Sequence, residues 1–183
     1  MSSEPRAFLR RLGAESLAHP GGTLLAHLDR VRERLAGWGA RPDLQLAGLC
    51  HACYGTDGFP AALLAPGRRT DLAAVIGTEA EAIVYAYGRC DRAGAYAALI
   101  EPGAPLRDRF TGRAFVPGPR LRRDLAELTA ANELDLAWED PEFRARWGPD
   151  LLELFTRLRP LLSRAAWEDC TAVLGDGVGA PAD

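Results

Sequence analysis

The stretch TLLAHLDRVRERLAGWG, residues 23–39, indicates the fold class because its apolar positions recur at helical spacing. Thr23 is a good helix N-cap, and the final glycine of the stretch is a typical stop. His27 lies three and four residues from Leu24 and Val31, so it shares their apolar face. The stretch therefore predicts an amphipathic helix with an inward-pointing histidine.

A second helix is expected directly afterwards, with Asp43 as its cap and Gly55 as its end. His51 follows Leu44 on the apolar side of this helix, so it too is expected to point inward. The third histidine, His19, lies four residues before Thr23, and no histidine follows residue 51. Histidine is the commonest metal ligand and the usual acid or base near neutral pH. The clustering predicts one site built from the N-terminal third.

The remaining pattern is helical almost throughout. It predicts an all-α bundle of seven to nine helices in a single domain, residues 1–175, followed by a disordered tail, residues 176–183. A short hairpin that turns at Thr111 and Gly112 is expected within the least helical part, residues 101–119. The other helices are expected at residues 4–18, 71–76, 79–87, 121–137, 149–162 and 165–174.

The composition excludes several classes of function. A net charge of −3 gives no reason to expect nucleic acid or an anionic membrane as a partner. Lysine is absent, which excludes Schiff-base and Walker-type lysine chemistry and is typical of a GC-rich, bacterial genome. There is no long apolar run and no signal-peptide pattern, so a cytoplasmic protein is expected. Cys50 and Cys53 flank His51 within an apolar run, where packing is the default interpretation.

The loop that follows His51 is polar and bracketed by glycines. Tyr54, Thr56 and Asp57 are therefore expected beside the imidazole, where they would bind substrate or orient the ring. The alternative is a simple helix stop in which Asp57 caps its own turn.

Three further side chains are candidates for substrate binding. Arg69 and Arg92 are suited to an anionic molecule, although arginine is more often a solvated surface residue. Asn132 lies in a helix rich in Ala and Leu, and a buried amide there needs polar partners. The aromatic residues of the C-terminal third indicate packing, with a homodimer face as one option.

The order of these features resembles the HD-domain superfamily of metal-dependent phosphohydrolases, especially the hydrolase domain of the guanosine tetra/pentaphosphate enzymes. In that pattern a second histidine follows the first by about two dozen residues, as His51 follows His27. The segment LAGL before His51, the segment VIGTEAEAIVYAY at 75–87 and the helix around Asn132 are similar to the family's blocks. A small group of HD-like proteins shares the AGLxHxxYGTDGF pattern as well. The resemblance implies a helical scaffold and a divalent metal.

The chain departs from this pattern at the metal ligands. Ala52 replaces the aspartate of the His-Asp doublet, and Leu128 stands where the last metal aspartate would be. His27, His51 and Asp57 would form a replacement set for iron, manganese or zinc, with His19 as a further imidazole.

The expected function is thus a small-molecule enzyme with two mechanisms open. With a metal, bound water would attack in a hydrolase-like reaction. Without a metal, His51 and His27 would act as acid and base in an isomerisation, elimination or cyclisation. A catalytically inactive module that binds a nucleotide or metabolite is the alternative, and purely structural core histidines are the plainest interpretation.

Overall fold

The computed structural model describes residues 4–57, 59 and 61–175, apart from the side chains of residues 92, 93 and 97. The predicted all-α class is confirmed. The described part contains nine α-helices: α1 (Glu4–Arg11), α2 (Leu24–Gly37), α3 (Pro42–Cys50), α4 (Arg69–Ile76), α5 (Thr78–Arg89), α6 (Arg92–Ile100), α7 (Pro119–Glu139), α8 (Pro141–Leu158) and α9 (Arg164–Gly175). Two short 3₁₀ helices, η1 (Pro66–Arg68) and η2 (Arg159–Leu161), join them.

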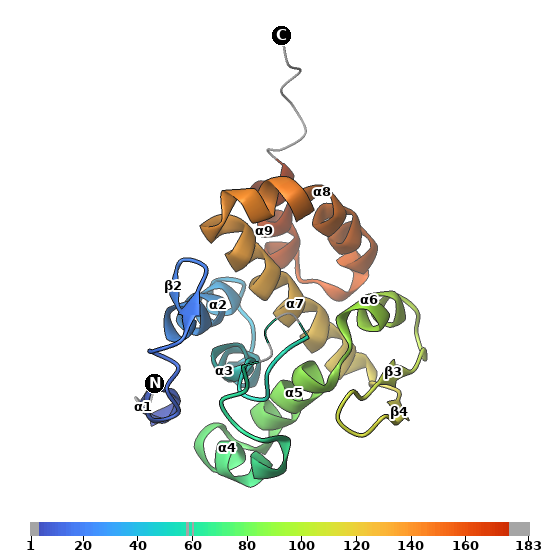
Figure 1. Cartoon of the computed structure of the whole chain (residues 1–183). Helices are drawn as coiled ribbons and strands as arrows, with labels where there is room; N and C mark the ends of the chain where they lie inside the picture. The colour runs from blue at the N-terminus through green and yellow to red at the C-terminus, as the bar shows by residue number, and fades with distance from the viewer. Residues whose placement is uncertain (1–3, 58, 60, 176–183) are drawn as a thin grey trace.

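Helix α7 runs through the middle of the molecule and organises the packing (Figure 1). The pair α2 and α3 packs on one side of α7, and α8 and α9 pack on another. Helices α4 and α5 continue the layer begun by α3. The central part of α7 is buried on all sides, including Asn132, Glu133 and Asp135. Polar side chains at the centre of a helical bundle need partners, so α7 is the natural place for a polar site.

Of the two predicted helix N-caps, one is present in the structure and one is not. The Thr23 side chain caps α2 by accepting from the Ala26 amide at 3.2 Å, as predicted. Asp43, in contrast, is not a cap, because α3 begins at Pro42 and places Asp43 in its first turn. Proline suits the first helical position because its missing N–H has no partner there in any case.

Three predicted helices have the wrong limits and one was missed. Helix α3 ends at Cys50, five residues before the predicted end at Gly55. Helix α1 ends at Arg11, and residues 12–17 of its expected second half form turns and a bend. A short hairpin follows, in which β1 (Ala18–His19) pairs with β2 (Gly22–Thr23). Helix α8 begins at Pro141, where Asp140 accepts from the Phe143 amide at 3.0 Å, and Pro149 lies inside it. Helix α6 was not predicted.

The hairpin in the insert is confirmed. Strand β3 (Leu106–Arg107) pairs with β4 (Ala114–Phe115), and the Asp108 carboxylate accepts from two amides of the turn. Arg109 donates from this insert to the carbonyls of Gly88 and Gly55, which anchors the beginning of the loop after His51 to α5. No described helix has the combination of length and apolarity that a bilayer crossing requires. The predicted tail, residues 176–183, lies outside the described residues.

Candidate active site

The two inward-pointing histidines meet at one cavity of about 240 Å³. Helix α2 contributes His27, the turn after α3 contributes His51, and α7 contributes Asn132. The rest of the lining is mostly apolar and comprises His19, Pro20, Leu24, Ala52, Thr56, Phe59, Leu136 and Phe143. The rings of His27 and His51 are only 1% and 2% exposed, so their polar atoms must find partners inside the protein.

His27 is oriented by a buried carboxylate. Its Nδ1 lies 2.6 Å from Asp135 Oδ2, and Arg30 donates to both oxygens of the same carboxylate at 2.7 and 2.9 Å. Burial would raise the pKa of Asp135, but the hydrogen bonds from His27 and Arg30 outweigh burial and hold that pKa below its ordinary value. An ionised Asp135 can only accept, so Nδ1 of His27 carries a proton.

His51 is oriented by the backbone. Its Nδ1 lies 2.8 Å from the Gly48 carbonyl, which also can only accept. Nδ1 of His51 therefore carries a proton, and its Nε2 points back toward His27. The two Nε2 atoms are 3.3 Å apart.

Asn132 completes the group, and its amide orientation is fixed by its neighbour. The Nδ2 atom donates to Glu133 Oε1 at 3.2 Å, which turns Oδ1 toward His27 Nε2 at 3.1 Å. Glu133 is 2% exposed, and Tyr96 of α6 lies near the same oxygen at 3.4 Å. The carboxylate thus ensures that Asn132 presents an acceptor to the histidines.

The site therefore brings three acceptor positions together. His27 Nε2, His51 Nε2 and Asn132 Oδ1 converge while both Nδ1 protons are held elsewhere. Buried lone pairs at such distances repel one another unless a proton or a cation lies between them. A proton on His27 Nε2 would be shared between His51 Nε2 and Asn132 Oδ1, which makes His27 a candidate acid and His51 a candidate base.

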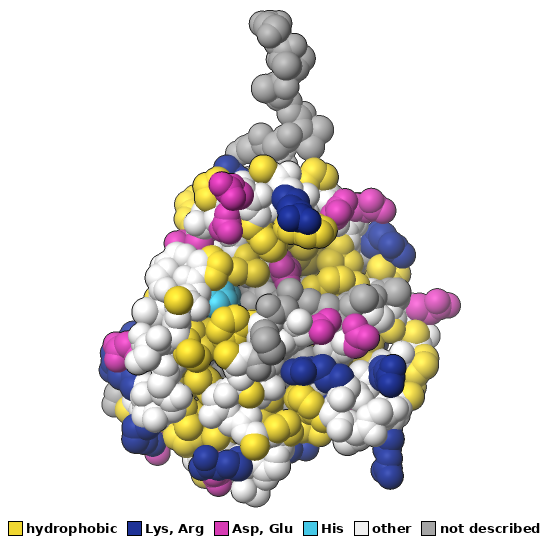
Figure 2. Space-filling view, viewed as in Figure 1, with side chains coloured by type: hydrophobic (Ala, Val, Ile, Leu, Met, Phe, Trp, Pro, Cys, Tyr) yellow, Lys and Arg dark blue, Asp and Glu magenta, His cyan; other side chains and the backbone are white. Residues whose placement is uncertain are grey.

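His19 covers this pair. Its ring stacks on His27 with centroids 4.0 Å apart, and Phe59 contacts its other side edge-on. Burial, followed by repulsion from His27, lowers the pKa of His19 to about 4. The ring is neutral at neutral pH. Figure 2 shows histidine atoms at the surface beside hydrophobic side chains, and His19 is the partly exposed ring of the three.

Two predicted substrate-binding residues lie elsewhere. Tyr54 donates to Glu81 at 2.8 Å, and Arg69 binds the same carboxylate with two hydrogen bonds at 2.7 and 2.6 Å. Glu81 is 4% exposed, so these contacts neutralise a buried charge. Neither residue lines the histidine cavity. Their role is to fix the loop against α5.

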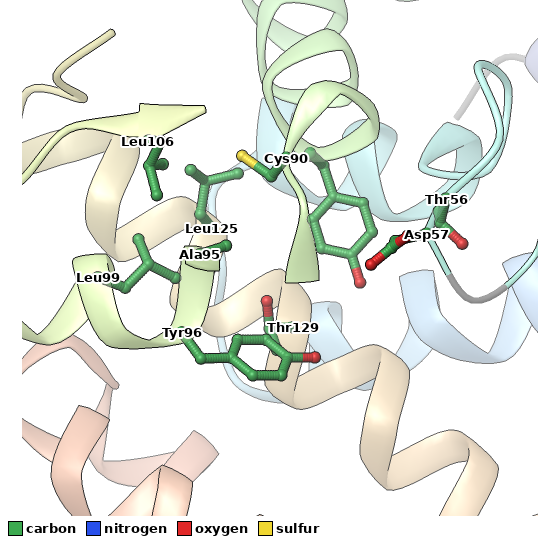
Figure 3. Close-up of a pocket in the computed structure, with 10 residues that line it drawn as sticks. Thr56, Asp57, Cys90, Ala95, Tyr96, Leu99, Leu106, Leu125 and Thr129 are labelled. Atoms are coloured by element: carbon green, nitrogen blue, oxygen red, sulfur yellow. The ribbon is translucent and has the colours of Figure 1, made fainter. Parts of the chain in front are cut away.

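The other two candidates of the loop after His51, Thr56 and Asp57, line different cavities. Thr56 lines the histidine cavity, while Asp57 points into a neighbouring cavity of about 30 Å³ between the loop, α6 and α7 (Figure 3). Thr56 is part of that second wall as well. The Arg92 side chain, also predicted to bind substrate, lies outside the described residues.

The predicted metal set of His27, His51 and Asp57 does not fit this geometry. Asp57 faces the other cavity, and the described side chains include no group of three His, Cys, Asp or Glu placed to hold a metal ion. Ala52 lines the cavity beside His51 with a methyl group, at the place where the HD pattern has a carboxylate. Among the described side chains, two imidazoles and one amide oxygen converge here, and no carboxylate or thiolate joins them as a further ligand.

Asp135 and Arg30 were missed in the sequence. Each lies three residues after a candidate, Asp135 after Asn132 and Arg30 after His27, so each shares a helix face with that candidate. This spacing was the available signal. It could not reveal that the two helices cross where these residues meet.

Residues 8–92 match the model of a family described as a domain of unknown function (DUF6817). The match covers less than half of the chain, from α1 to the start of α6, and includes all three histidines but not α7. No curated protein and no solved structure matches the chain.

Proposed function

We propose that this protein is a metal-independent acid/base enzyme of small-molecule metabolism, with His51 and His27 as the catalytic pair. The observation that carries the proposal is the convergence of three polar atoms in one cavity, where His27 Nε2 lies 3.3 Å from His51 Nε2 and 3.1 Å from Asn132 Oδ1. A core histidine needs one partner for each nitrogen. This arrangement instead places the Nε2 atoms of two imidazoles 3.3 Å apart beside an open volume, where one ring can serve as acid and the other as base.

The chemistry follows from the proton count. With the shared proton on His27 Nε2, His51 Nε2 acts as the base and removes a proton from the carbon next to a substrate carbonyl. His27 donates its Nε2 hydrogen to the oxygen on which negative charge develops. In an isomerisation, His51 returns its proton to another carbon of the enol, and the enol hydroxyl returns its proton to His27. In an elimination, the enol hydroxyl again returns its proton to His27 as the carbonyl re-forms, and the group that leaves from the β-carbon takes the proton held by His51. Asp135 supports the positive charge on His27 in both cases.

The cavity limits the substrate. Its volume suits a small group, and its walls are mostly apolar. No arginine is among the described residues that line it, so the positive charge that would attract an anionic or carbonyl group is the shared proton itself. The proposed scaffold is a degenerate HD-like bundle. The meeting of His27 and His51 supports this view, while Ala52 is its departure from the HD pattern.

Exchange of carbon-bound hydrogen tests the proposal without knowledge of the natural substrate. A panel of small ketones and 2-oxo acids is incubated with the protein in D₂O, and loss of the α-proton signal is followed by NMR. The wild type is expected to accelerate exchange for some members. The variant His51→Gln should lose at least a hundredfold of that rate with its helical circular dichroism unchanged.

The control is Tyr54→Phe, which alters a neighbouring residue outside the cavity and should retain exchange. Equal rates in the wild type and His51→Gln would refute acid/base catalysis. Binding of panel members without any exchange would favour the inactive binding module, which the sequence also permits.

A further inference from the structure

The histidine cavity adjoins a larger groove on the surface. The groove has a volume of about 470 Å³, and Phe143 lines both it and the cavity. A second link runs through α7, where Asn132 lines the cavity, Glu133 lines the groove and the two side chains are hydrogen-bonded. Figure 2 shows hydrophobic side chains bordering the hollow below α8.

One face of α8 forms the apolar wall of the groove. Phe143, Trp147, Leu151 and Leu154 follow one another at steps of four, four and three residues, so they form one stripe along the helix. At about 1.5 Å of rise per residue the stripe is about 16 Å long. Trp147 is 43% exposed, although the neighbouring core would be a more favourable place for an indole.

The charges at the groove restrict its occupant. Glu133 and Asp150 are the charged residues among its described lining. These carboxylates disfavour an anion, and the aromatic and leucine side chains favour an apolar chain. The charged or carbonyl end of such a molecule is then left for the histidine cavity, where the shared proton would receive it.

We propose that the groove along Phe143, Trp147 and Leu154 binds the apolar tail of an amphipathic ligand whose carbonyl or carboxylate head lies at His27 and His51. This proposal rests on the proposed function and defines its substrate class. The ligand is longer than the cavity alone can hold, and its affinity depends on the length of the apolar chain that contacts α8.

Straight-chain carboxylates from butanoate to decanoate, below their micellar concentrations, are suitable probes. Their affinity is measured by calorimetry, and the histidine side-chain ¹⁵N signals are recorded in the same samples. Affinity should rise about threefold to fourfold for each methylene once the chain passes Phe143. The histidine signals should move with every member that binds.

The variant Trp147→Ser should weaken decanoate by about tenfold or more and leave butanoate within twofold. Trp138→Ser is the matched control, because Trp138 is also an exposed tryptophan, at 64%, but lines a different surface depression. Both side chains are exposed, so neither change should affect folding.

Two results would overturn the inference and leave the proposed function standing. One is an affinity that does not depend on chain length while the histidine signals still respond. The other is an equal loss in Trp147→Ser and Trp138→Ser. Decanoate that binds through Trp147 without moving the histidine signals would also overturn it, because the head would lie elsewhere. Absence of α-proton exchange with every ketone and 2-oxo acid of the panel would instead count against the proposed function.

Discussion

Replacement of Asp135 by asparagine tests the link between stability and the histidine pair. The carboxylate is 2% exposed and accepts three charge-assisted hydrogen bonds, one from His27 and two from Arg30. Asparagine in its best orientation keeps two of them as weaker bonds to a neutral acceptor and places its NH₂ group against the third donor. Each charge-assisted bond contributes roughly 1.5–3 kcal/mol. We expect Asp135→Asn to lower the free energy of unfolding by about 3 kcal/mol.

Urea denaturation followed by circular dichroism measures this change. A double-mutant cycle with Arg30→Met should give a coupling energy of only about 1–2 kcal/mol, because the Arg30 side chain is 26% exposed and partly screened by solvent. Asp169→Asn is the matched control. Asp169 also accepts from an arginine of α2, Arg34 at 2.6 Å, but it is 28% exposed, so its loss should cost about 1 kcal/mol or less. A cost for Asp135→Asn no larger than that for Asp169→Asn would refute the reasoning.

Three further predictions concern the surroundings of the pair. Glu81→Gln leaves Arg69 without its charged partner and should cost about 2–3 kcal/mol in urea denaturation, with the histidine ¹⁵N signals unmoved; moved signals would contradict the separation of the two clusters. The pKa of His19 is lowered to about 4, so the unfolded state binds more protons below about pH 6.5, and stability falls as pH drops from 6.5 toward 4. In His19→Phe the fall in the free energy of unfolding between pH 6.5 and 4 should be smaller by roughly 1–2 kcal/mol, a value that allows for the partial exposure of the ring. An unchanged pH dependence of unfolding in this variant would refute the prediction. Ala52→Asp should destabilise the protein without metal and bind Co²⁺ beside His51, as shown by visible absorption; no absorption with the fold intact would count against an HD-like arrangement.

The fold class could be predicted because its signals are local. The apolar spacing around His27 and the cap at Thr23 defined α2 without any knowledge of its neighbours. The limits of α8 could not be read in this way. Pro149 seemed to start a helix, but the turns before it are held by the Asp140 cap, and proline inside a helix is tolerated when packing compensates.

The site could be predicted only for residues that are unusual in themselves. Histidines are few, and a buried asparagine is conspicuous, so His27, His51 and Asn132 were found. Asp135 and Arg30 are ordinary charged residues in the sequence, and their importance arises from the crossing of α2 and α7. Arg69 was misjudged for the converse reason, since its partner Glu81 lies on another helix and neutralises it.

The most direct test of the account is to measure by NMR which nitrogens of the histidine side chains carry protons. The chain has three histidines, so their signals are easy to assign. Protein labelled with ¹⁵N-histidine is examined by long-range ¹H–¹⁵N correlation at neutral pH, with His→Gln variants for assignment. We predict protonated Nδ1 atoms on both His27 and His51 and a single proton shared by their Nε2 atoms. Signals for Nε2–H tautomers with unprotonated Nδ1 on either ring would contradict the central claim.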